Sequence, residues 1–111
     1  MSGHAPKPGS LEISSALVDG TVTISLRGEL DLASARRVEE SFVAIDEQSP
    51  TRVVVDLAGL AFIDSSGLRS LLLADALASE HGYELVLRPG QDSVQRVFDV
   101  TGALDVLRFE H

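Results

Sequence analysis

One segment, residues 52–74, constrains the fold most, because it joins a buried strand to a helix through a pair of serines. Residues 52–57 (Arg-Val-Val-Val-Asp-Leu) have the density of β-branched side chains that is typical of a buried parallel strand. Residues 68–74 (Leu-Arg-Ser-Leu-Leu-Leu-Ala) have helical spacing and high helix propensity. The segment therefore predicts a parallel strand that leads directly into a helix.

The two serines at this junction are candidates for regulation. Ser65 or Ser66 is expected to be the N-cap of the helix. Free backbone N–H groups and the positive end of the helix dipole face that position, so an added phosphate would be held locally without melting the fold. An ordinary serine cap and a chemical switch are the two interpretations of this junction.

The rest of the chain alternates strands and helices without internal repeats. An Asp19-Gly20 pair predicts a tight hairpin turn. Asp92 and Gln95 resemble a capping box, and Gly82 and Gly102 are expected to end helices. We expect strands over residues 11–18, 21–27, 52–57, 83–87 and 106–109, and helices over residues 33–46 and 66–81. A third helix is expected after the Asp92 cap, with Val94, Val97, Phe98 and Thr101 on one side. The order β-β-α-β-α-β-α-β predicts a single α/β domain with a mixed sheet, its parallel units closed by right-handed helical crossovers.

Length and composition fit one domain. The chain has 111 residues, 44% of them hydrophobic, enough for one core. Residues 1–10 are rich in Pro and Gly and are expected to form a flexible tail, and residues 11–111 the folded domain. The sequence has no cysteine, signal-peptide pattern or apolar run of membrane-spanning length, so the cytoplasm is the expected location.

The charge of the chain argues against binding to nucleic acid. The formal net charge is −8, and Lys7 is the only lysine. Counterion release on nucleic acid needs clustered basic side chains, whereas the arginines here are scattered among acidic residues. An acidic surface suits a partner with basic patches, and plain solvation explains the charge equally well.

Enzyme chemistry finds little support in the sequence. No histidine is placed to activate Ser65, because His4 is in the tail, His81 is at a helix end and His111 is terminal. The chain has neither the G-x-S-x-G elbow nor a phosphate-binding loop. Three carboxylates near strand ends could form a magnesium site or include a phosphate acceptor, although capping is their commoner role: Asp31, Asp56 and Asp64. We expect no resident metal and no cofactor.

The helix after the serines carries more leucine than one buried face requires. At about 100° per residue, Leu73 lies roughly 140° and Leu77 roughly 180° round from Leu68. Single exposed leucines are common and need no cause. Alternatively, an amphipathic stripe beside Ser65 docks a partner, formed by Arg69, Ser70, Leu73 and Leu77.

Three motifs together resemble the STAS family, and within it the small bacterial anti-sigma factor antagonists. They are Gly-Glu-Leu-Asp at residues 28–31, Asp-Ser-Ser-Gly-Leu at 64–68 after the buried strand, and Val-Phe-Asp-Val-Thr-Gly at 97–102. The resemblance runs from about Leu11 to Phe109. It implies the same mixed-sheet fold that the order of elements predicts. Asp75 departs from the pattern expected of a buried helix stripe.

Partner switching is what the resemblance implies about function. An unphosphorylated antagonist of this family binds an anti-sigma factor, itself a serine kinase of the histidine-kinase-like ATPase fold, and so frees a sigma factor for transcription. The kinase phosphorylates the first serine of the motif, here Ser65, and a metal-dependent serine phosphatase removes the phosphate. Asp31 and Asp64 match the acidic positions beside that serine, while Ser66 and Gly67 match the positions after it. The alternatives are a STAS scaffold or nucleotide-sensing module and, more remotely, a hydrolase or phosphotransferase.

Overall fold

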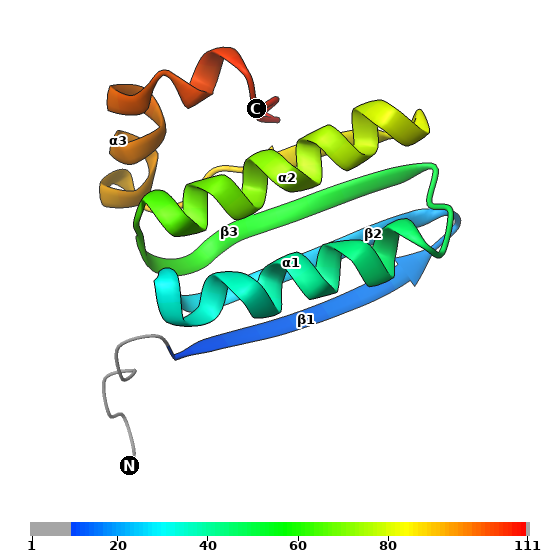
Figure 1. Cartoon of the computed structure of the whole chain (residues 1–111), viewed down its shortest axis with the longest axis horizontal. Helices are drawn as coiled ribbons and strands as arrows, with labels where there is room; N and C mark the ends of the chain where they lie inside the picture. The colour runs from blue at the N-terminus through cyan, green and yellow to red at the C-terminus, as the bar shows by residue number, and fades with distance from the viewer. Residues whose placement is uncertain (1–9, 111) are drawn as a thin grey trace.

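A computed structural model describes residues 10–110 and has a single mixed sheet with helices packed on it (Figure 1). The elements are β1 (Leu11–Val18), β2 (Thr21–Leu30), α1 (Leu32–Asp46), β3 (Arg52–Ile63), α2 (Ser65–His81), β4 (Glu84–Arg88), α3 (Asp92–Thr101) and a 3₁₀ turn, η1 (Ala103–Asp105). The strand order is β1-β2-β3-β4, with β1 antiparallel to β2 and the other pairs parallel. The predicted α/β class is confirmed. The expected tail lies outside the described residues except for Ser10.

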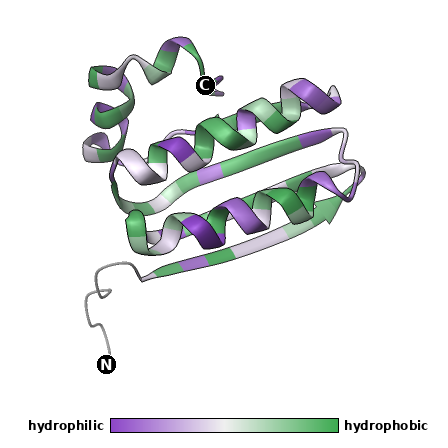
Figure 2. Ribbon diagram, viewed as in Figure 1, coloured by the Kyte–Doolittle hydropathy of each residue, from purple (hydrophilic) through white to green (hydrophobic). Residues whose placement is uncertain are grey.

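Helices α1 and α2 lie side by side over one face of the sheet (Figure 1). Alternate residues of β2, among them Val22, Ile24 and Leu26, point toward these helices and are buried. Strand β3 is hydrophobic along most of its length (Figure 2), which fits a central strand. Near α3, the ring of Phe98 packs edge-on against Phe109, with centroids 5.1 Å apart.

The hairpin between β1 and β2 has the predicted turn. Val18 pairs with Thr21, so the loop contains only Asp19 and Gly20. Both loop residues have positive φ, 52° and 80°, as a type I′ turn requires. The Asp-Gly signal therefore sets the register of the first two strands.

Two parallel strands run further than the sequence predicts. Strand β2 extends to Leu30 and β3 to Ile63, and these two residues pair with each other. The extensions interrupt regular pairing twice and contain Gly28 and Gly59, so local propensity does not mark them as strand. Because the extensions move both strand ends, they decide which residues begin the helices.

The C-terminal part differs from expectation in two ways. The predicted strand 106–109 is reduced to one parallel bridge between Leu87 and Phe109. The predicted Asp92 and Gln95 capping box is wrong, because α3 begins after Gln91, which makes no side-chain cap. Gln95 instead accepts a hydrogen bond from the Gly90 N–H at 2.9 Å, which braces the loop before the helix.

Candidate functional site

The N-termini of α1 and α2 meet beyond the carboxyl ends of β2 and β3. Since Leu30 pairs with Ile63, the next residues, Asp31 and Asp64, also lie close together, and each is the N-cap of its helix. The Asp64 N–H donates to the Leu30 carbonyl at 3.2 Å, which continues the contact between the two strands. The sheet thus places two acidic caps and two positive helix ends at one site.

Asp64, rather than a serine, caps α2. Its Oδ1 accepts a hydrogen bond from the Gly67 N–H at 3.0 Å, and its Oδ2 accepts one from the Leu32 N–H at 3.3 Å. The expectation that Ser65 or Ser66 is the N-cap is wrong: both are within the first turn of the helix. Aspartate caps as well as serine does, and the length of β3 places the extended cap residue one position earlier.

Asp31 is held by a serine that the sequence interpretation missed. Ser34 is fully buried, its Oγ accepts from the Asp31 N–H at 3.0 Å, and its hydroxyl donates to the Glu29 carbonyl at 2.8 Å. The Asp31 carboxylate in turn accepts from the Ala33 N–H at 3.0 Å. A polar residue three positions after an acidic cap was the available signal.

The two serines of the motif differ in exposure. Ser65 is exposed on the first turn of α2, whereas Ser66 is half-buried. Among residues 10–110, their backbone N–H groups have no hydrogen-bond acceptor, as is usual at the start of a helix. A negative group on the Ser65 side chain would therefore lie beside free donors and two helix dipoles, and also beside the Asp64 carboxylate.

Gly67 is required by the close approach of α2 to β2. A Cβ atom at this position would lie 2.6 Å from both the carbonyl oxygen and the Cγ of Leu30, and 2.9 Å from Cγ1 of Ile63. Because two of these contacts are with side chains of the core and one is with backbone, little can move aside. The glycine therefore lets the first turn of α2 sit against the strand ends and fixes the position of Ser65.

The expected docking stripe on α2 is only partly at the surface. Ser70 was expected on it and is instead fully buried, donating to the Gly67 carbonyl at 2.6 Å. The reason is that α2 packs against both α1 and the sheet, so its buried arc is wider than one stripe. Arg69 is exposed, Leu73 is 39% exposed, and Leu77 is half-buried against the core.

Two exposed apolar side chains flank the site and have no counterpart in the sequence-based prediction. Leu32, whose N–H is bound by Asp64, is 78% exposed. Phe62, two residues before Asp64, is 48% exposed. Both lie where the lengthened strands give way to helices, so their exposure follows from strand ends that local propensity does not reveal.

Asp56 does not join the other two aspartates. Its Oδ1 accepts from the Ala58 N–H at 2.9 Å and its Oδ2 lies 3.8 Å from Arg88 Nη1, a capping and ion-pair role. Within the described part of the chain, no three His, Cys, Asp or Glu side chains are grouped as a metal site would need. No helix there is long and apolar enough to cross a membrane.

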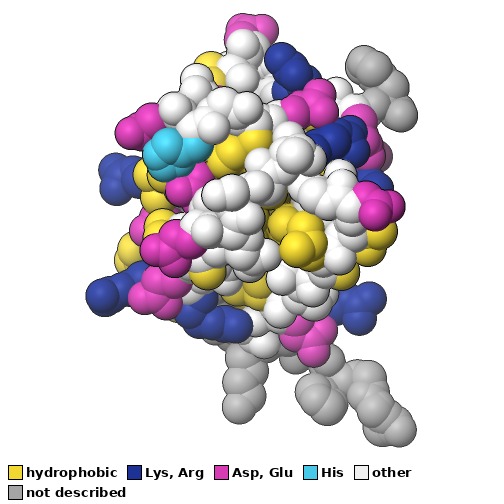
Figure 3. Space-filling model, turned by 90° about the vertical axis from the view of Figure 1, so that its right-hand side faces the viewer, with side chains coloured by type: hydrophobic (Ala, Val, Ile, Leu, Met, Phe, Trp, Pro, Cys, Tyr) yellow, Lys and Arg dark blue, Asp and Glu magenta, His cyan; other side chains and the backbone are white. Residues whose placement is uncertain are grey.

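His81 lies at the opposite end of α2 from Ser65. Its Nδ1 and the Tyr83 hydroxyl both lie 2.8 Å from Oδ1 of Asp46, at the end of α1. Figure 3 shows this end of the molecule, with the histidine in cyan against acidic side chains. The hydrogen bond raises the pKa of His81 and lowers the pKa of Asp46, while burial, followed by the bond to Asp46, raises the pKa of Tyr83.

Comparison with known proteins identifies the family to which this fold and motif belong. A family model described as "Mlab, STAS domain" matches residues 13–108. The "Putative anti-sigma factor antagonist BtrV" of Bordetella bronchiseptica is 34% identical over 80% of this chain and 77% of BtrV. The anti-sigma-F factor antagonist RsfB of Mycobacterium tuberculosis is 34% identical over 58% of this chain and 52% of RsfB.

Solved structures share the architecture. An anti-sigma factor antagonist from Mycobacterium paratuberculosis has 28% identity and a TM-score of 0.79, covering 94% of this chain and 88% of that one. SpoIIAA in its unphosphorylated form has 22% identity and a TM-score of 0.77, covering 90% and 89%, and so supports the fold. The chain belongs to the STAS domain family, within its group of anti-sigma factor antagonists.

Proposed function

We propose that this chain binds an anti-sigma factor and thereby frees a sigma factor, and that phosphorylation of Ser65 switches the binding off. The observation that carries the proposal is the exposed Ser65 hydroxyl on the first turn of α2, where two helix N-termini meet. The names of the relatives supply the class of partner, and the site supplies a position at which one charge can act.

The free protein tolerates a phosphate at Ser65 better than a complex does. Phosphoserine adds roughly −1.5 to −2 charge, which the helix ends stabilise in the free protein. In a complex that covers the site, the phosphate is desolvated beside Asp64. An unpaired buried charge at an interface costs about 2–5 kcal/mol, which weakens binding roughly thirty- to several-thousand-fold. That range is enough for a switch.

The anti-sigma factor is proposed to be the kinase as well as the binding partner. In this scheme a serine kinase of the histidine-kinase-like ATPase fold transfers phosphate from ATP to Ser65, and a metal-dependent phosphatase returns the hydroxyl. The cycle takes place in the cytoplasm. Ser65 is the acceptor and not a nucleophile of its own, because His81, the one histidine in residues 10–110, is at the far end of α2.

Co-purification tests the proposal. The tagged chain is recovered from its own cells with and without phosphatase inhibition, and bound proteins are identified. We expect an anti-sigma factor with the unphosphorylated form and its loss as phosphate accumulates. Recovery of the same partner in equal amount from both samples would contradict the switch. A thermal shift with nucleotides is the matching test of the alternative sensing module.

A further inference from the structure

The sheet has one covered edge and one open edge among the described residues. Strands β1 and β4 are the two outer strands. Beyond β4, the Leu87 N–H donates to the Arg108 carbonyl and the Glu110 N–H donates to the Leu87 carbonyl, each at 2.9 Å. Beside β1, residues 10–110 provide no strand or bridge, and its outer side is contacted by Arg37, which donates to the Leu11 carbonyl at 3.0 Å.

Strand β1 has few of the features that protect exposed edges, since Glu12 is its one charged residue. It pairs with β2 over eight consecutive residue pairs without a bulge. Its sequence, Leu-Glu-Ile-Ser-Ser-Ala-Leu-Val, contains no Pro, Gly or Lys. Natural edge strands are blocked by such residues, by bulges or by a covering segment, and an unblocked one is ready to pair with another strand.

The hairpin fixes which backbone groups of β1 face outward. Val18 and Thr21 flank a two-residue loop and therefore form a hydrogen-bonded pair, after which bonded and non-bonded pairs alternate. The N–H and C=O groups of Ile13, Ser15 and Leu17 consequently point away from β2. The contact of Arg37 with the carbonyl of Leu11, another odd-numbered residue, agrees with this alternation.

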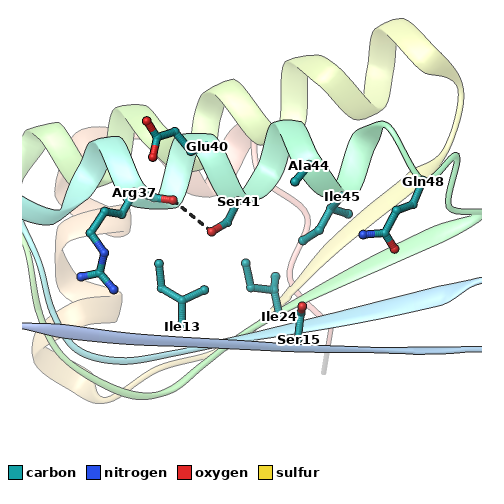
Figure 4. Close-up of a pocket in the computed structure, with 9 residues that line it drawn as sticks. All are labelled: Ile13, Ser15, Ile24, Arg37, Glu40, Ser41, Ala44, Ile45 and Gln48. Atoms are coloured by element: carbon teal, nitrogen blue, oxygen red, sulfur yellow. Dashed lines mark hydrogen bonds between the residues drawn. The ribbon is translucent and has the colours of Figure 1, made fainter.

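A hollow of mixed polarity runs beside this edge, between α1 and β1. Its volume is about 510 Å³, and Ile13, Ile24 and Ile45 line its floor and back (Figure 4). The rest of the lining is polar apart from Ala44 and consists of Ser15, Arg37, Glu40, Ser41 and Gln48. Leu17, on the same side of β1 as Ile13, is 56% exposed.

We propose that β1 pairs antiparallel with β1 of a second copy of this chain, around a two-fold axis at Ser15. The two four-stranded sheets then form one continuous sheet, with the helices of both copies on the same side. Three residue pairs exchange backbone hydrogen bonds: Ser15 with Ser15 of the partner subunit, and Ile13 with Leu17 of the partner subunit, twice. The exposed Leu17 of the partner subunit is thereby placed beside Ile13, in the apolar floor of the hollow.

Charge complementarity favours a second copy as the occupant. In this register Leu11 lies opposite Asp19 of the partner subunit. The Arg37 guanidinium, which donates to the Leu11 carbonyl, therefore lies beside the carboxylate of Asp19 of the partner subunit. Neither Arg37 nor Asp19 forms an ion pair within residues 10–110, and symmetry makes the contact twice. Glu12, the one charge on β1, lies opposite Val18 of the partner subunit, so no like charges oppose each other.

Pairing at β1 leaves the switch site free. Helix α2 packs near β3 and β4, and β2 separates these strands from β1. Ser65 therefore stays exposed in both copies. The proposal goes beyond the proposed function and does not depend on it.

Cysteine crosslinking tests the two-fold axis, because the chain has no cysteine of its own. Paired Cα atoms in a hydrogen-bonded antiparallel pair are about 5.5 Å apart, within the range that a disulfide spans. The full chain with Ser15→Cys should convert to a covalent dimer under mild oxidation. Ser14 is also exposed, but in this register it lies opposite Ala16 of the partner subunit and not opposite Ser14 of the partner subunit. The Ser14→Cys chain should therefore stay mainly monomeric. Equal crosslinking of both variants, or of neither, would overturn the proposal.

Sedimentation equilibrium tests the hydrogen bonds and the charges. Ser15→Pro removes an N–H group that points away from β2, so the monomer should still fold. The dissociation constant of the dimer should rise by roughly fivefold for each hydrogen bond lost. Arg37→Glu should weaken the dimer, because it places a carboxylate opposite Asp19 of the partner subunit. Adding Asp19→Asn to the same chain removes that repulsion and should restore part of the loss, and asparagine tolerates the positive φ of this turn position. A wild-type chain that stays monomeric at millimolar concentration would contradict the proposal, as would equal dimerisation of folded Ser15→Pro.

Discussion

The carboxylate of Asp64 accepts a hydrogen bond from the Leu32 N–H at 3.3 Å, and so ties the N-terminus of α1 to that of α2. Its other oxygen caps α2 through the Gly67 N–H. One side chain beside Ser65 therefore stabilises both helices that border the proposed switch.

Removing this carboxylate should destabilise the fold. Asp64→Ala leaves the Gly67 and Leu32 N–H groups without their acceptor, and loss of an N-cap typically costs about 0.5–2 kcal/mol. Urea unfolding measures the change. Asp64→Ser is the matched control, since serine can still cap Gly67 and should recover much of the loss. A free energy of unfolding for Asp64→Ala equal to that of wild type would contradict the linking role.

Adding a methyl group at Gly67 should also destabilise the chain. The new Cβ would lie 2.6 Å from the Leu30 carbonyl oxygen, and overpacking of this kind costs typically about 1–3 kcal/mol. Ser66→Ala, which adds no volume on the same turn, is the control and should stay close to wild type. If Gly67→Ala unfolds at the same urea concentration as wild type, the close approach of α2 to Leu30 does not require a glycine at this position.

The exposed side of α2 can be tested with two leucines. Leu73 is 39% exposed, so Leu73→Ala should lower the free energy of unfolding by only about 0.5–1 kcal/mol. If Leu73 anchors the anti-sigma factor, the same change should weaken binding by about 1–2 kcal/mol. Leu71 is 1% exposed, and Leu71→Ala should cost about 2–5 kcal/mol of stability. Normal partner affinity of Leu73→Ala would remove this residue from the interface.

The pair of His81 and Asp46 should make stability depend on pH. The pKa of His81 is raised in the folded protein, so its contribution is fully present below the unfolded pKa of about 6.5 and is lost as the pH rises through the folded value. The pKa of Asp46 is lowered, so the contribution also falls as the pH drops below about 3.9.

Urea unfolding of wild type and His81→Gln over a range of pH measures this contribution. The difference in stability between the two should be largest in mildly acidic solution and should shrink above neutrality. Asp46→Asn is the control, because it should abolish most of the pH dependence of that difference. A difference that does not vary with pH would show that the contact is not an ion pair in solution.

Local signals account for the parts of the fold that the sequence predicts. The Asp19-Gly20 pair sets a hairpin by its positive φ angles, and three-and-four spacing marks α1 and α2 within one residue of their bounds. The extensions of β2 and β3 could not be predicted in this way, because they depend on pairing between distant segments that contain glycine.

The sequence names the residues of the candidate site but does not reveal their arrangement. Asp31, Asp64 and the two serines were all identified, yet the choice of Asp64 as the cap depends on where β3 ends. Ser34 and Ser70 were hidden for a different reason: a small polar side chain on a helix gives no sign of burial until the packing of the helix is known.

The claim that phosphorylation of Ser65 switches binding off is tested most directly by mapping phosphate on this chain after incubation with its purified partner. The chain is incubated with the purified anti-sigma partner and ATP, phosphate is located by mass spectrometry, and the affinity of each form is measured. The account predicts phosphate on Ser65, none on Ser65→Ala with binding retained, normal modification of Ser66→Ala, and at least roughly thirtyfold weaker binding of the phosphorylated form. Phosphate on Ser66, or unchanged affinity after modification of Ser65, would contradict it.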